Sequence, residues 1–66
     1  MVNERLRAAI RERYGSESQL AERLGWTRQK MSKTVRGERN PRISDINALS
    51  REMRISVGEV ISFFEQ

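Results

Sequence analysis

The sequence predicts an all-α fold, a compact bundle of five short helices that forms a single domain over residues 1–66. Three observations support this fold class. Apolar residues recur at helical spacing along most of the chain, and glycines and capping residues divide it into five segments. No stretch alternates apolar and polar residues as a half-buried strand does. The single domain is predicted because no linker, repeat or low-complexity segment interrupts the 66 residues.

The first predicted helix covers residues 3–14. Asn3 is suited to cap its N-terminus, because its side-chain oxygen can accept a free backbone N–H of the first turn. Gly15 is suited to end it. The inward face carries three apolar residues at helical spacing, Leu6, Ala9 and Ile10.

The second predicted helix begins at a capping box, in which Ser16 and Gln19 satisfy each other's backbone amides. Gly25 stands where a left-handed residue ends a helix, and Thr27 can cap the next one. Because only Trp26 lies between these two residues, the chain must turn sharply between two short helices. The inward residues of this helix are Leu20, Ala21 and Leu24.

The third predicted helix covers residues 28–36 and stops at Gly37. At about 100° per residue, its two sides differ in character. One side is directed toward the core and carries Met31, Thr34 and Val35. The opposite side is polar and basic and carries Gln29, Ser32, Lys33 and Arg36, with Arg28 at its flank.

After the basic loop that ends at Pro41, the fourth helix is predicted over residues 43–53. Ser56 and Glu59 form a second capping box that opens the fifth helix. The fourth helix is expected to direct inward a stripe of Ile43, Ile46, Leu49 and Met53. The fifth is expected to place on one face Val57, Val60, Ile61 and Phe64.

Positive charge is concentrated in the middle of the chain. Residues 1–22 are neutral in sum and residues 43–66 carry a net −2, whereas residues 23–42 hold seven basic side chains against Glu38 alone, a net +6. Such a segment is expected for a polyanionic partner, because each phosphate that is neutralised releases condensed counterions. A membrane surface or an acidic protein is the alternative partner for the same charge.

Composition also excludes several function classes. The chain has no cysteine and no histidine, so no thiolate or imidazole is present to bind a metal or to activate a nucleophile. We therefore expect no metal, no cofactor and no enzymatic activity. The charged N-terminus and the lack of a long apolar run argue against a secretory signal or a membrane span, which predicts a cytoplasmic protein.

The exposed side of the third predicted helix carries the side chains that base edges require. Arginine and lysine donate to guanine, glutamine pairs with adenine, and serine serves either role. A plain solvated helix would have the same composition. The tight turn before this helix and the basic loop after it favour a helix that enters the major groove.

The segment QLAERLGWTRQKMSK at residues 19–33, followed by RGERNP at residues 36–41, strongly resembles the Cro and phage-repressor helix-turn-helix family, also called the xenobiotic response element family. The resemblance continues through Ile61 and includes ISVGEV at residues 55–60. It implies a lambda-repressor-like domain whose second and third helices form the helix-turn-helix. It also implies a dimeric transcriptional repressor of bacterial or phage type that places residues 28–36 in the major groove of an operator.

Position by position, the resemblance implies roles for individual residues. The side chains expected to read bases are Arg28, Gln29, Ser32 and Lys33. The side chains expected to contact the DNA backbone are Ser18, Gln19, Thr27, Lys30, Arg36, Arg39, Asn40 and Arg42.

The chain departs from the family pattern at two positions. Glu17 stands where the family often has a glutamine that binds a phosphate, so Ser18 or Gln19 is expected to replace that contact. Val35 stands where the family often has a glutamate paired with an arginine of the first helix, which leaves Arg11 without that partner.

The aromatic residues raise the question of a protein partner. Phe63 lies about 100° from the centre of the fifth helix's apolar stripe, so a chain of 66 residues can hardly bury both Phe63 and Phe64. We expect these residues to form a homodimer contact. The alternative is a protein-interaction module, such as an antitoxin that uses the fifth helix to bind a toxin. Trp26 in the turn is expected to pack at the core boundary rather than stack on bases.

Overall fold

The computed structural model describes residues 2–65 and contains five α-helices, with no strand among those residues. Their bounds are α1 Glu4–Tyr14, α2 Glu17–Leu24, α3 Arg28–Val35, α4 Ile43–Met53 and α5 Val57–Phe64. The predicted all-α fold is therefore confirmed, and the three helices with predicted bounds, α1, α3 and α4, match them to within one residue. Within the described part of the chain, no helix is both long and apolar enough to cross a membrane.

Side-chain caps start four of the five helices, each at the residue that the sequence indicates. In every case the side-chain oxygen accepts a backbone N–H three residues ahead, which satisfies one of the unpaired amides of the first turn. The cap residues are Asn3, Ser16, Thr27 and Ser56, with donor-to-acceptor distances of 3.0, 3.3, 3.0 and 3.1 Å.

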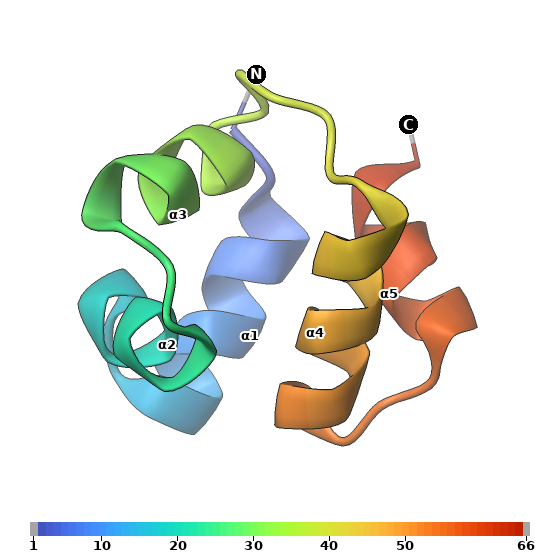
Figure 1. The fold of residues 1–66 in the computed structure, drawn as a ribbon, viewed down its shortest axis with the longest axis horizontal. Helices are drawn as coiled ribbons and strands as arrows, with labels where there is room; N and C mark the ends of the chain where they lie inside the picture. The colour runs from blue at the N-terminus through green and yellow to red at the C-terminus, as the bar shows by residue number, and fades with distance from the viewer. Residues whose placement is uncertain (1, 66) are drawn as a thin grey trace.

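The helices form two groups that share one core. α1, α2 and α3 pack on one another, and α4 packs on α5 and α2 (Figure 1). The view in Figure 1 places α1 between α3 and the α4–α5 pair. All five helices contribute buried apolar residues to the core, which are Leu6, Ile10, Leu20, Ala21, Met31, Val35, Leu49, Met53 and Val60.

The first turn of α4 differs from the predicted stripe. Ile43 was expected to face inward, but its side chain is 78% exposed, and the buried residue of this turn is Asp45. Ile46 is half-buried, and only Leu49 and Met53 reach the core. The reason is positional, because Ile43 is the first residue of the helix, and the buried residues of α4 begin only at Asp45.

The face that α5 turns to the core also differs from the prediction. Val60 is buried as expected, but Val57 and Ile61 are 41% and 39% exposed. Phe63 and Phe64 are both half-buried and pack against the core. The N-terminal end of α1 covers this side, since the Arg5 guanidinium lies 5.4 Å from the centre of the Phe63 ring and Asn3 donates to the Phe63 carbonyl.

Candidate nucleic-acid interface

The turn between α2 and α3 is built as the sequence indicates. Gly25 adopts a left-handed conformation with φ of 74°, which an L side chain adopts only at an energetic cost. Trp26 follows and is half-buried against the core, as predicted. Its backbone N–H donates to the Ala21 carbonyl at 2.9 Å. Thr27 then caps α3. The turn therefore fixes the direction in which α3 leaves α2.

α3 has one buried side and one exposed side. Met31, Thr34 and Val35 are at most 1% exposed, as the sequence predicts. Thr34 is polar, but its hydroxyl donates to the Lys30 carbonyl at 2.8 Å and so has a partner. The opposite side is open to solvent, and its exposed residues are Arg28, Gln29, Lys33 and Arg36. Ser32 on the same side is half-buried.

The exposed side of α3 and the start of α2 line one open surface depression of about 500 Å³, which we call the α2–α3 groove. It brings together all four predicted base-reading residues and two predicted phosphate-contacting residues. Its lining is Glu17, Ser18, Arg28, Gln29, Met31, Ser32, Lys33 and Arg36. Polar side chains of both helices therefore converge on one surface.

The remaining predicted phosphate-contacting residues do not line this groove, and their surroundings differ. Gln19 and Thr27 are exposed near the starts of α2 and α3, and Asn40 and Arg42 are exposed in the loop that leads to α4. Lys30 and Arg39 are different, because both are half-buried and directed toward Asp45.

The two departures from the family pattern also have a structural setting. The Glu17 carboxylate lies at the groove with Arg7 Nε 4.0 Å away, so α1 supplies it with a nearby positive charge. Val35 is fully buried in the core, and Arg11 is exposed with no ion pair among residues 2–65. Arg7, rather than Arg11, is thus the α1 arginine that reaches α2.

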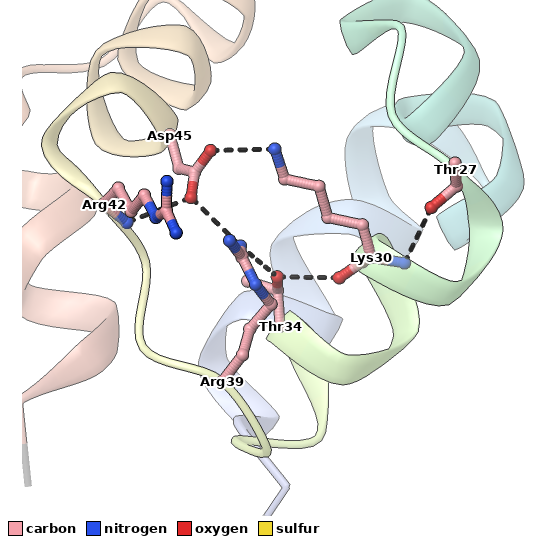
Figure 2. A network of polar contacts seen from close by, with 6 residues as sticks. All are labelled: Thr27, Lys30, Thr34, Arg39, Arg42 and Asp45. Atoms are coloured by element: carbon pink, nitrogen blue, oxygen red, sulfur yellow. Dashed lines mark hydrogen bonds and ion pairs between the residues drawn. The ribbon is translucent and has the colours of Figure 1, made fainter.

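Asp45 is the centre of a polar cluster that sequence reasoning missed. One carboxylate oxygen lies 3.0 Å from Lys30 Nζ, and the other accepts from Arg39 Nη1 and from the backbone N–H of Arg42, each at 3.0 Å (Figure 2). We call these four residues the Asp45 cluster. It links α3, the following loop and the first turn of α4. The available signal was an acidic residue at the third position of a helix directly after a basic loop.

The surroundings of Asp45 stabilise its charged form. Burial of the carboxyl group raises its pKa, but the hydrogen bonds from the Arg42 N–H, Lys30 and Arg39 outweigh that effect. Together they lower the pKa of Asp45 from 3.8 to about 2. Ionised Asp45 is therefore part of the folded structure at neutral pH.

This shift predicts a loss of stability in acid. Because the pKa is lower in the folded than in the unfolded chain, the stabilisation is present above about pH 4 and is lost as the pH falls toward 2. The loss amounts to about 2 kcal/mol at 1.36 kcal/mol per pKa unit. Urea unfolding between pH 5 and pH 2 measures it. The free energies of unfolding of the wild type and Asp45→Asn should converge across this range; a gap that stays constant would contradict the assignment.

The fold and the site together define a class of protein. α2 and α3 are two short helices joined by a tight turn, and α3 exposes a polar and basic face. This arrangement is a helix-turn-helix DNA-binding domain. The sequence profile of the Cro/C1-type HTH DNA-binding domain matches residues 5–66, and the chain belongs to this family. No curated protein and no solved structure matches the chain.

Proposed function

We propose that this domain binds double-stranded DNA sequence-specifically and acts as a transcriptional repressor of bacterial or phage type, without catalysis and without a cofactor. The observation that carries the proposal is the α2–α3 groove, where four side chains able to bond base edges share one exposed surface. In this role α3 enters the major groove of an operator in the cytoplasm, and the start of α2 lies against the DNA backbone at the edge of that groove.

Individual residues divide into two roles. Arg28, Gln29, Ser32 and Lys33 read bases, because they stand on the exposed side of α3. Sequence-independent contacts with phosphates come from other exposed residues of α2, of the ends of α3 and of the loop before α4, which are Ser18, Gln19, Thr27, Arg36, Asn40 and Arg42. Lys30 and Arg39 were also predicted to contact phosphates. In this structure both side chains are paired with Asp45, so a phosphate would have to compete with this carboxylate for them.

We further propose that the domain binds DNA as a homodimer with a contact through α5. Phe63 and Phe64 are half-buried and retain accessible surface, while Val57 and Ile61 are the more exposed apolar residues of the same helix. Apolar surface of this kind, open on a domain of 66 residues, favours burial against another chain.

Selection of bound duplexes from a random DNA pool, together with the mass in solution, tests the proposal. The selected duplexes should share a two-fold symmetric site with half-sites about 10 base pairs apart. The mass should be twice the 7.7 kDa of one chain. A bound pool without any common sequence would contradict sequence-specific binding.

The same exposed apolar residues support a second candidate function, a protein-interaction module such as an antitoxin that binds a toxin through α5. The mass measurement separates the two. A stable homodimer in the absence of any partner favours the repressor, whereas a monomer that gains stability only with a second protein favours the module.

A further inference from the structure

The basic segment of the chain is less available to DNA than its charge suggests. Of its seven basic side chains, four have an acidic partner: Lys30 and Arg39 share Asp45, Arg36 lies 3.0 Å from Glu38, and Arg23 lies 3.7 Å from Glu52. The other three have no ion pair among residues 2–65, and they are Arg28, Lys33 and Arg42.

The partners differ in burial. The side chain of Asp45 is 5% exposed, compared with 52% for Glu38 and 25% for Glu52. Water and salt screen an exposed pair strongly and a buried pair much less. A phosphate can therefore displace Glu38 from Arg36 easily. It displaces Asp45 less easily, because this carboxylate is buried, although the side chains of Lys30 and Arg39 remain 34% and 25% exposed.

Further contacts hold both cations in place. Lys30 Nζ lies 4.4 Å from the centre of the Trp26 ring, a favourable position for a cation over an aromatic face. Arg39 Nη1 lies 3.4 Å from the Thr34 hydroxyl oxygen. Figure 2 shows both side chains directed from α3 and the loop toward Asp45, and neither residue lines the α2–α3 groove.

We propose that Asp45 masks Lys30 and Arg39 from DNA phosphates and so determines how tightly the domain binds unrelated DNA. The inference rests on the proposed function, since it assumes that the domain binds duplex DNA. In this arrangement, phosphate contacts come from the exposed cations, and the two masked ones hold α3, the loop and α4 together. When the affinity for unrelated DNA is low, the preference of the domain for one sequence over another depends on the base contacts of α3.

The substitution Asp45→Asn tests the masking directly. Asparagine keeps the shape and the oxygen that accepts the Arg42 N–H, but it removes the charge that holds Lys30 and Arg39. The measurement is the affinity for a random-sequence duplex at several salt concentrations. For each cation released, the slope of log K against log salt should steepen by about 0.9. The affinity at about 0.1 M salt should then rise about 8-fold if one cation is released and about 60-fold if both are.

Two further variants show whether the released cations cause the effect. Glu38→Gln makes the same change in net charge at an exposed pair and should alter the slope by less than about 0.3. The triple variant Lys30→Gln, Arg39→Gln, Asp45→Asn should return to the wild-type slope. The proposal is wrong if Asp45→Asn behaves like Glu38→Gln, or if the triple variant keeps the steeper slope.

Arg39→Gln keeps the test decisive even if Asp45→Asn unfolds, because it leaves Asp45 paired with Lys30. We expect its affinity for the random duplex to stay within twofold of the wild type. A slope shallower by about 0.9 would show that Arg39 already contacts a phosphate and would overturn the masking. Failure of the wild type to bind any duplex would instead refute the proposed function.

Discussion

The double substitution of Gln29→Ala and Lys33→Ala is expected to weaken binding to the selected duplex by about 2 to 6 kcal/mol, since each base contact contributes about 1 to 3 kcal/mol. The two residues lie one helical turn apart on the exposed side of α3, within the α2–α3 groove. Neither forms a hydrogen bond or ion pair through its side chain within residues 2–65, so their removal leaves the fold intact.

Arg42→Ala is the matched control for this substitution. Arg42 is exposed in the loop before α4, outside the α2–α3 groove, and its contribution to the Asp45 cluster is its backbone N–H, which alanine retains. It should weaken the selected and random duplexes by the same factor, with a salt slope shallower by about 0.9. Equal losses on both duplexes for the groove double variant would show that Gln29 and Lys33 do not read bases.

Leu20→Ala is expected to destabilise the fold by about 2 to 5 kcal/mol, the range for a buried leucine cut back to alanine. Leu20 is fully buried in α2, the helix that packs against α1, α3 and α4, so the substitution would leave a cavity in the core that these helices share. A single core in a domain of this size supplies roughly 3 to 5 kcal/mol. The variant should therefore lose between about two fifths and all of its stability, and its DNA binding should fall with its helicity.

Circular dichroism during urea unfolding measures the effect of Leu20→Ala. Glu22→Ala is the control, because it changes an exposed residue of the same helix and should shift stability by at most about 0.5 kcal/mol. If both variants unfold at the same urea concentration as the wild type, the core does not depend on Leu20.

Features that depend on neighbours in sequence were predictable. The N-caps at Asn3, Ser16, Thr27 and Ser56 form within four residues, so the side chains themselves specify where four helices begin. The buried side of α3 followed from helical spacing, and its opposite side is exposed as expected. The sequence also carries the family pattern, which the matched profile over residues 5–66 confirms.

Features that depend on contacts between distant residues were not predictable. Helical spacing shows which residues share a face, but not how far along a helix the neighbouring helices extend, and so Ile43 was wrongly placed in the core. The same limit applies to α5, where α1 covers Phe63 and leaves Ile61 exposed.

The sequence by itself determined the five helices, the tight turn, the basic segment and the side of α3 that faces solvent, because each follows from spacing or from side chains a few positions apart. Only the tertiary structure decided which positive charges are paired. Lys30 and Arg39 meet Asp45 across 15 and 6 residues of chain, and an ion pair depends on distance in space and on burial.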